Sequence, residues 1–324
     1  MAEQGREEQS LADALLNASL ADFEAAAARI AGDAIRTPLL PYAAAGGRTI
    51  RLKCENLQPL GSFKIRSGAS AVAALDTPEA VVTASAGNFA QGLTLAARRR
   101  GIPVTVHAPD TAAGVKLDAM RALGAEVVSH PFERWWGILA TREAADGVFV
   151  HPVAEPAVIL GNGTIGLELA ADWPELDTVV VPFGGGGLVS GIALALRALG
   201  RRVRIVACEA ETAAPLAAAF AAGQPVPVER RASFVDGIGS GRVLDEMWPL
   251  LSRLVDEVVV VSLDEIRAAL RSLALEAHMI AEGAGAAALA AALSPRCGGR
   301  NVAAVVSGGN LDPRHLCEIL AGTP

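Results

Sequence analysis

Lysine is rare in this chain, and one lysine stands in a segment whose residue types suit chemistry. The chain has 324 residues, and its only lysines are Lys53, Lys64 and Lys116. Lys64 lies in ENLQPLGSFKIRSG, residues 55–68. An amine with an ordinary pKa of about 10.4 can lose its proton when burial disfavours the cation, and it can then attack a carbonyl, whereas a guanidinium stays charged. Lys64 is therefore either a Schiff-base lysine or a surface cation, and this segment supports both interpretations equally.

A run of four glycines forms the clearest local pattern. In TVVVPFGGGGLVSGIALALRA, residues 178–198, Gly184, Gly185, Gly186 and Gly187 separate a predicted strand from a predicted helix. Glycines let backbone N–H groups approach an anion, and a helix N-terminus adds a favourable dipole. A tight turn needs fewer glycines, so we favour a phosphate site over a purely structural turn.

A dinucleotide site is an alternative for the same glycines. Gly185, Gly187 and Gly191 have the spacing GxGxxxG, and Glu209 ends the next predicted strand, where a ribose ligand would lie. The strict GxGxxG pattern is absent, and this interpretation leaves Lys64 without a role.

Two further segments carry polar residues directly after predicted strands. In VVTASAGNFAQG, residues 81–92, Ser85, Asn88 and Gln91 supply donors where a helix begins, which suits a carboxylate. An ordinary helix cap is the structural alternative, but one serine would be enough for it. In VAAVVSGGNLD, residues 302–312, Ser307 follows a strand.

The elements that must position these residues alternate between strand and helix. Short β-branched runs alternate with alanine-rich helical stretches from residue 80 onward, which predicts an α/β fold with mostly parallel, doubly wound sheets. Turn residues near 76–79 and 147–156 suggest a small domain, 79–151, inserted in a large domain formed by 1–78 and 152–324. The large domain would bind the phosphate.

Parallel strands bring the four polar turns to one edge. Open α/β sheets bind ligands outside the carboxyl ends of their strands, and the segments around Ser85, Gly184, Glu209 and Ser307 all follow such ends. A phosphate cradle, a carboxylate loop and an unusual lysine together indicate pyridoxal 5'-phosphate holding an amino acid.

Composition excludes several other classes. The net charge of −7 argues against a nucleic-acid surface, and four scattered cysteines give neither a zinc pattern nor a disulfide framework. No basic, apolar leader and no membrane span is visible, so we expect a cytoplasmic protein whose partner is a small-molecule substrate.

The chain resembles the fold-type II pyridoxal-phosphate enzymes, specifically the threonine/serine dehydratase and serine racemase family within the tryptophan synthase β-like superfamily. The resemblance extends from about Thr37 to Asp312. It rests on the following motifs, in this order: ENLQPLGSFKIRSGA, SAGNFAQG, GIPVTVHAPDTAAGVKLDAMRALGAEV, HPVAEPAVILGNGTIGLE, VVPFGGGGLVSGIA, FVDGI, AEGAGA and SGGN.

The resemblance implies a role for each matching position. Lys64 would carry the cofactor as a Schiff base, and Phe63 would pack on one face of its ring. The phosphate would lie against Gly184, Gly185, Gly186, Gly187 and Leu188. Asn88 would bind the ring hydroxyl, Ser307 would face the pyridine nitrogen, and the ring edge would meet Gly237 and Glu282. The substrate carboxylate would lie in the loop that contains Ser85, Ala86, Gly87, Asn88 and Gln91.

The implied activity is that of an ammonia-lyase, or dehydratase. Lys64 would remove the α-proton of a 3-hydroxy amino acid such as L-threonine or L-serine, and the β-hydroxyl would leave. Aminoacrylate would then hydrolyse to a 2-oxo acid and ammonia. A neutral serine at the pyridine nitrogen makes a weak electron sink, which favours fast β-elimination over transamination.

Departures from the family pattern narrow this expectation. Racemases of the family carry a serine as second acid/base where this chain has Ala86, so we expect a lyase rather than a racemase. Phe89 replaces a frequent histidine, and Trp135 and Trp136 stand at usually polar positions, where they either pack or cover the substrate side chain.

A divalent cation is expected to be absent. Some relatives bind one with residues that match Glu209, Ala213 and Pro215, and proline cannot ligate a metal. Glu209 remains a weak candidate ligand, and we expect a solvated glutamate.

Three alternatives stay open at this point. Within the family, the protein could be an amino-acid racemase or a β-replacement synthase. Outside it, a two-lobed protein could hold an amino acid without chemistry. The family resemblance also suggests a homodimer.

Overall fold

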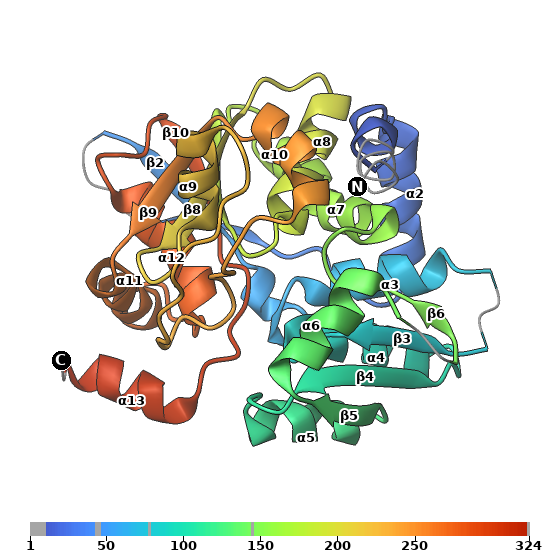
Figure 1. The fold of residues 1–324 in the computed structure, drawn as a ribbon. Helices are drawn as coiled ribbons and strands as arrows, with labels where there is room; N and C mark the ends of the chain where they lie inside the picture. The colour runs from blue at the N-terminus through green and yellow to red at the C-terminus, as the bar shows by residue number, and fades with distance from the viewer. Residues whose placement is uncertain (1–10, 43–46, 77–78, 144–145, 323–324) are drawn as a thin grey trace.

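The strands of the computed structural model form two separate sheets (Figure 1). The structure describes residues 11–42, 47–76, 79–143 and 146–322. The larger sheet has the order β1-β2-β10-β7-β8-β9 and the smaller one β5-β4-β3-β6. All neighbouring strands are parallel except β1 and β2. The strands are β1 (Leu39–Tyr42), β2 (Thr49–Lys53), β3 (Val81–Ala84), β4 (Val104–Pro109), β5 (Glu126–His130), β6 (Val148–Phe149), β7 (Thr178–Pro182), β8 (Arg204–Ala210), β9 (Glu257–Val261) and β10 (Asn301–Val305).

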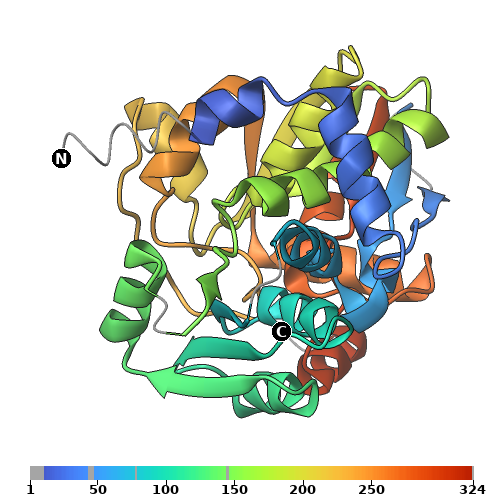
Figure 2. The ribbon, with the colours of Figure 1, turned by 90° about the vertical axis from the view of Figure 1, so that its right-hand side faces the viewer.

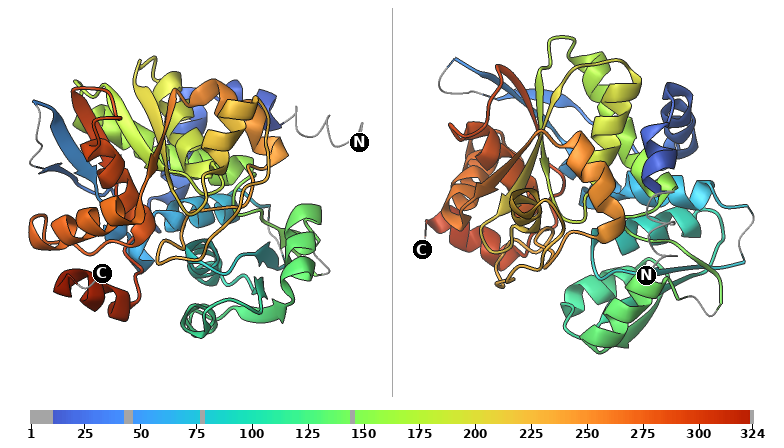
Figure 3. Two further views of the ribbon diagram at one scale, coloured as in Figure 1. Left: turned by 60° about the vertical axis from the view of Figure 1, so that its left-hand side comes forward. Right: turned by 45° about the horizontal axis from the view of Figure 1, so that its top comes forward.

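Helices cover both faces of the larger sheet. Residues on one side of its strands, such as Val179 and Val181, pack with α7, α8 and α10, and residues on the other side, such as Val180 and Val206, pack with α11 and α12. The left view of Figure 3 shows these two helical layers with the sheet between them. The α-helices are α2 (Leu20–Ile30), α3 (Lys64–Ala73), α4 (Asn88–Arg98), α5 (Gly114–Ala122), α6 (Phe132–Thr141), α7 (Pro156–Asp172), α8 (Gly187–Ala198), α9 (Pro215–Ala222), α10 (Trp248–Leu254), α11 (Leu263–Leu275), α12 (Gly283–Leu293) and α13 (Pro313–Ala321).

These findings confirm the predicted α/β class with mostly parallel, doubly wound sheets. The β-branched runs AVVT, VTVHA, AEVV, VFV, TVVVPF, RIVAC, EVVVV and VAAVV each predict a strand, and each strand is present within one or two residues of its run. The sequence analysis missed β1, the antiparallel edge strand that contains Pro41, because proline donates no ladder hydrogen bond and interrupts the strand pattern. No helix in the described part of the chain is long and apolar enough to cross a membrane.

The smaller sheet lies to one side of the larger one, with α6 on one face and α4 on the other (Figure 2). Its strands all fall between residues 81 and 149. This separation supports the small inserted domain, 79–151, which remains a proposal. Helix α3 precedes that range, yet Ala69, Ala71 and Val72 belong to the core of the smaller sheet. Helix α3 therefore lies at the junction of the two parts.

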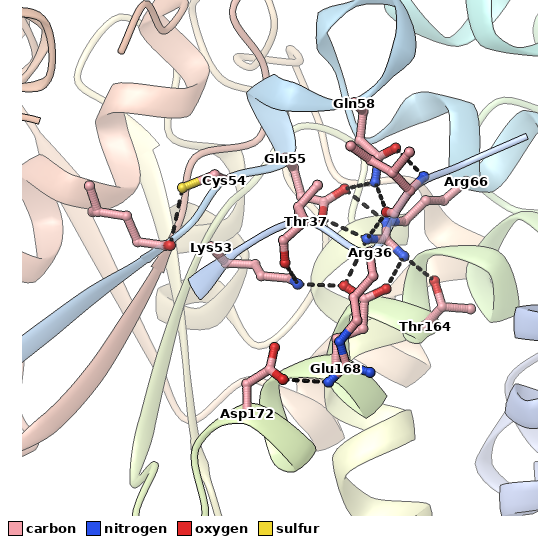
Figure 4. A network of polar contacts seen from close by, with 12 residues as sticks. Arg36, Thr37, Lys53, Cys54, Glu55, Gln58, Arg66, Thr164, Glu168 and Asp172 are labelled. Carbon is pink, nitrogen blue, oxygen red and sulfur yellow. Dashed lines mark hydrogen bonds and ion pairs between the residues drawn. The ribbon is translucent and has the colours of Figure 1, made fainter. Parts of the chain in front are cut away.

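A buried ionic network holds the first turn of α3 (Figure 4). Arg66, which is 1% exposed, donates to both oxygens of Glu55 at 2.8 and 2.9 Å and to both oxygens of Glu168 at 2.7 and 2.9 Å. Lys53 also pairs with Glu168 and donates to the Thr37 carbonyl at 2.7 Å. Bidentate geometry allows the buried charges to satisfy one another. The network joins β2, α3 and α7, and Arg66 is two residues after Lys64.

Arg66 also controls the ionisation of its partner. Burial alone would raise the pKa of Glu55, but the guanidinium of Arg66 and the ammonium of Lys53 hold that pKa below its ordinary value. The stabilisation is therefore present above the ordinary pKa of a glutamate and is lost as the pH falls through the lowered folded-state value.

The first prediction concerns this network. Replacing Arg66 with methionine leaves the Glu55 carboxylate buried without its main counter-charge. We expect a loss of about 3–5 kcal/mol in the free energy of unfolding at pH 7, measured by urea denaturation. The loss should shrink in acid, where protonation of Glu55 removes the unpaired charge.

Arg314→Met is the matched control. Arg314 pairs with Asp312 at the surface, where its side chain is 86% exposed, so this variant should keep the urea midpoint of the parent. Equal midpoints for Arg66→Met and the parent would contradict the role of the buried network.

Candidate active site

Lys64 lies at the wall of a cavity of about 310 Å³. It is the first residue of α3, and its amine is 4.9 Å from the ring centroid of Phe63 and 5.5 Å from that of Phe89. Burial lowers the pKa of the amine to about 8, although the nearby Glu282 carboxylate opposes this shift. The structure therefore places at this position an amine that is readily deprotonated near neutral pH.

The glycine run forms another part of the wall. Gly184, Gly185, Gly186, Gly187 and Leu188 all line the cavity, and Gly187 begins α8. The N–H groups in the first turn of a helix have no partner within the helix, so they are available to an anion. A side chain at residue 185 would not fit, because its Cβ would lie 2.5 Å from a methyl group of Val153. Gly186 has φ of 98°, which side chains rarely adopt.

Two glycines bring α3 and α4 together. A Cβ on Gly92 would lie 2.6 Å from the carbonyl oxygen of Lys64, and one on Gly68 would lie 2.5 Å from the backbone nitrogen of Leu93. The two helix backbones are therefore in direct contact. This contact sets the distance between Lys64, at the start of α3, and Asn88, at the start of α4.

Asn88 is oriented by two neighbours. Its amide nitrogen donates to the two oxygens of Glu282 at 3.1 and 3.3 Å, and its amide oxygen accepts from Asn310 at 2.9 Å. Burial raises the pKa of Glu282 to about 7, while the hydrogen bond from Asn88 and the charge of Lys64 lower it and Asp236 raises it. Glu282 therefore changes its charge close to neutral pH.

Ser307 is tied to the lysine segment through the backbone. It follows β10, is 3% exposed and lines the cavity. Its carbonyl accepts from the Phe63 N–H at 3.0 Å, and Gly309 donates to the Gly61 carbonyl at 2.8 Å. The end of β10 and the start of α3 consequently hold each other in place.

Most of the residues that the sequence analysis selected line this one cavity. They are Phe63, Lys64, Ser85, Gly87, Asn88, Gly184, Gly185, Gly186, Gly187, Leu188, Gly237, Glu282 and Ser307. The cavity wall does not include Ala86, Gln91 or Glu209. A direct contact of Ala86 or Gln91 with the substrate therefore has no support from the geometry.

Glu209 has a structural role, and the expectation of a solvated side chain was wrong. It is 1% exposed and accepts from the backbone N–H groups of Leu216 and Ala217 at 2.8 and 2.9 Å. Burial raises its pKa to about 7, against the effect of these two bonds. Its carboxylate thus caps the N-terminus of α9. In the described residues, no three His, Cys, Asp or Glu side chains come together as a metal-binding group.

The two tryptophans of α6 pack away from the cavity. The Trp135 indole donates to the His107 carbonyl at 3.2 Å, and Trp136 is 43% exposed and stacks on Phe132. Neither indole lines the cavity around Lys64. The structure therefore supports packing rather than a cover over the substrate side chain.

Several residues at the site were missed in the sequence analysis. Val153, Arg230 and Ser240 line the cavity, as do Lys116 and Asp236, whose side chains pair at 2.5 Å. Asn310 orients Asn88. The SGGN motif contains Asn310, so its position was a usable signal, whereas nothing in the local sequence around Arg230 distinguishes it from a surface arginine.

The arrangement suits a phosphorylated carbonyl compound that reacts with an amine. One cavity brings together a lysine amine with a lowered pKa, an anion cradle that tolerates no side chain at residue 185, the partly buried amide of Asn88 and the neutral Ser307. These are the requirements of a pyridoxal-phosphate enzyme.

Comparisons with known proteins agree with this class. The family model described as pyridoxal-phosphate dependent enzyme matches residues 30–308. An L-threonine ammonia-lyase of Thermotoga maritima is 41% identical over 281 residues, which cover 85% of this chain and 70% of that protein. A serine racemase of Mus musculus is 38% identical over 318 residues, which cover 92% and 93%. The structure of maize serine racemase matches with a TM-score of 0.84 and 33% identity, over 94% of this chain and 97% of that one.

The chain therefore belongs to the pyridoxal-phosphate-dependent enzyme family. The comparisons confirm the predicted family, fold class and cofactor, and they confirm the prediction of a pyridoxal-phosphate-dependent lyase.

The second prediction tests the cradle. A methyl group at residue 185 would collide with Val153, so Gly185→Ala should weaken pyridoxal-phosphate binding at least about tenfold, a cost near 1.4 kcal/mol. Titration of the protein by its visible absorption measures this affinity. Gly137→Ala is the control, because a Cβ there meets nothing within 4 Å and should leave the affinity unchanged.

The third prediction concerns the amine. Only the neutral amine attacks the cofactor, so the rate of cofactor capture should rise with a midpoint near pH 8, the lowered pKa of Lys64. Glu282→Gln removes a negative charge that favours the ammonium, and the midpoint should move to lower pH. A midpoint near the ordinary lysine pKa in both proteins would show that Lys64 is not buried in solution.

Proposed function

We propose that this protein is an ammonia-lyase that acts on a 3-hydroxy amino acid such as L-threonine or L-serine and releases a 2-oxo acid and ammonia by β-elimination. The observation that carries the proposal is the Lys64 amine, whose pKa is lowered to about 8, in one cavity with the glycine cradle and the neutral Ser307. The L-threonine ammonia-lyase at 41% identity supports the same activity.

Lys64 is the proposed catalytic base. When bound, pyridoxal phosphate withdraws electrons from the substrate α-carbon and so acidifies its proton. With a pKa near 8, the Lys64 amine is partly neutral at physiological pH, which suits it to accept that proton. The apolar rings of Phe63 and Phe89, 4.9 and 5.5 Å from the amine, contribute to the burial that disfavours the ammonium and so keep the amine available to accept the proton.

The start of α4 is the proposed site of the substrate carboxylate. Ser85, Gly87 and Asn88 line the cavity at the carboxyl end of β3, and the helix begins at Asn88. Free N–H groups and the helix dipole favour a carboxylate there. Phe89 offers no donor, so backbone groups and Ser85 hold this anion.

Ser307 favours elimination in this proposal. A hydroxyl brings no negative charge to the pyridine nitrogen, so negative charge at the α-carbon is weakly stabilised. Rapid loss of the β-hydroxyl is then preferred over the slower transamination reaction. Gly184, Gly185, Gly186, Gly187 and Leu188 would hold the cofactor phosphate, which would supply a proton-donating group to the site.

Racemisation is the second candidate, because a serine racemase is 38% identical to this chain. Removal and return of the proton on opposite faces requires a second acid, and residue 86 is alanine. We therefore place racemisation below elimination. A β-replacement synthase and an amino-acid binder without chemistry rank lower still.

The proposal includes a homodimer in the cytoplasm. Four cysteines occur in the chain, and Cys54, Cys208, Cys297 and Cys317 are all free in the structure, which suits a reducing compartment. The dimer rests on the family resemblance alone.

The fourth prediction tests the lysine. Lys64→Ala should lose both the visible absorption of the bound cofactor and the release of ammonia from L-threonine and L-serine. Lys64→Arg, which keeps the charge but cannot act as a neutral base, should be as inactive as Lys64→Ala. Ammonia release by either variant at the parent rate would refute the assignment.

The same assay separates the two candidates. Incubation of the parent enzyme with L-serine should give pyruvate and ammonia with little D-serine. D-serine formed faster than pyruvate would favour the racemase.

A further inference from the structure

One charged side chain of the cavity wall has no part in the chemistry above. The charged residues that line the cavity are Lys64, Lys116, Asp236, Glu282 and Arg230. Lys116 pairs with Asp236, and Glu282 accepts from Asn88. In the described ranges of the chain, the guanidinium of Arg230 forms no hydrogen bond or ion pair. Arg230 is thus a permanent cation at the exposed rim of the cavity, solvated and without a protein counter-charge.

The backbone on both sides of Arg230 is fixed. The Val228 N–H donates to the Gly241 carbonyl at 2.8 Å, and the Arg231 N–H donates to the Thr212 carbonyl at 2.9 Å. The segment is therefore held between the loop at 236–241 and the turn after β8. Arg230 has an anchored main chain and an uncommitted head group, which is the arrangement of a ligand-binding arginine.

The loop beside Arg230 packs on the phosphate cradle. The Ser240 hydroxyl donates to the Gly184 carbonyl at 3.0 Å, and a Cβ on Gly184 would lie 3.5 Å from the Gly237 carbonyl oxygen. A second cavity, of about 220 Å³, shares Arg230, Asp236, Ile238 and Gly239 with the first. Arg230 therefore stands where the site has room beyond the cofactor and the α-carbon.

The anionic groups that take part in the proposed reaction indicate which group Arg230 would bind. The glycine cradle takes the cofactor phosphate, and the start of α4 takes the substrate α-carboxylate. The anion that remains for Arg230 is one on the substrate side chain, and a guanidinium fork binds a carboxylate with two parallel hydrogen bonds.

We propose that Arg230 forms a subsite for a side-chain carboxylate, so that the enzyme prefers 3-hydroxy amino dicarboxylates such as 3-hydroxyaspartate over L-threonine and L-serine. This inference rests on the proposed ammonia-lyase function. The substrate loses its α-proton and its β-hydroxyl as water, and hydrolysis of the resulting imine returns one water and releases ammonia. The products are a four-carbon 2-oxo dicarboxylate and ammonia, and no oxidant is needed.

The first test is binding without turnover. L-Aspartate and L-asparagine have nearly the same shape, differ in side-chain charge and lack the β-hydroxyl. Titrated against the holoenzyme and followed by the visible spectrum, L-aspartate should bind at least about tenfold more tightly than L-asparagine. Arg230→Gln should abolish that ratio, and Arg230→Lys should restore part of it. Arg231→Gln is the matched control, because the Arg231 side chain binds the Glu211 carbonyl and does not line the first cavity.

The second test is turnover. In the parent enzyme, kcat/KM for ammonia release should be at least about tenfold higher with 3-hydroxyaspartate than with L-threonine. Arg230→Gln should remove this preference mainly through a higher KM for 3-hydroxyaspartate, whereas Arg231→Gln should keep the preference.

The outcomes separate the two proposals. Turnover of L-threonine with no preference for 3-hydroxyaspartate overturns the subsite and leaves the lyase standing. No ammonia from any 3-hydroxy amino acid, together with tighter aspartate binding that depends on Arg230, overturns the lyase and keeps the subsite. If Arg230→Gln weakens cofactor binding without changing the aspartate to asparagine ratio, Arg230 serves the phosphate and the subsite is wrong.

Discussion

The site depends on one constraint, which is that a primary amine must be desolvated enough to lose its proton readily and still lie in the cavity where an anion binds. Helix α3 meets this constraint because it starts at the junction of the two sheets. Arg66, two residues after Lys64, is clamped by Glu55 and Glu168, and the backbone of α3 touches that of α4 at Gly68 and Gly92. A buried ion pair adds little net stability compared with apolar packing, but separating its partners is costly because it leaves a buried charge unpaired. This cost holds the first turn of α3, and with it Lys64, in place.

Glycine has two physical uses in this molecule. At Gly68 and Gly92 the missing side chain permits helix backbones to touch, and at Gly185 it leaves room beside Val153 next to the anion cradle. Both uses carry the entropic cost of glycine, so the surrounding structure must compensate. At Gly186, which has a left-handed backbone conformation, the side chains of Leu251 and Phe183 pack against the glycine and help to offset this cost.

Parallel strands explain how much of this site could be read from the sequence. The β-branched runs before Ser85, Gly184 and Ser307 clearly predicted strands. Because parallel pairing brings the carboxyl ends of these strands to one edge of a sheet, this part of the cavity wall was predictable. Local pairs such as the capping box of Ser19 and Asp22 were predictable for the same reason, since three residues of sequence separation decide them.

Contacts made only by tertiary packing were not predictable. Glu209 looked solvated because its partners are the N–H groups of a helix that begins six residues later, and their position depends on the turn between them. The pairing of Lys116 with Asp236 joins residues 120 positions apart. No feature of the local sequence distinguishes Arg230. It lines the cavity and has no counter-charge among the described residues, and both properties depend on tertiary structure.

The pair formed by Lys64 and Glu282 shows why these packing contacts matter for chemistry. Their pKa values, about 8 and about 7, place both groups close to neutrality, and each favours the charged form of the other. As the pH rises through this range, Glu282 ionises and accepts from Asn88 as a carboxylate, and Lys64 loses its proton. The form with a neutral base and an oriented Asn88 therefore exists on the alkaline side of both values. Because burial opposes the charge on each group and their attraction favours it, the pH at which this form appears depends on how tightly α3, α4 and the start of α12 are packed.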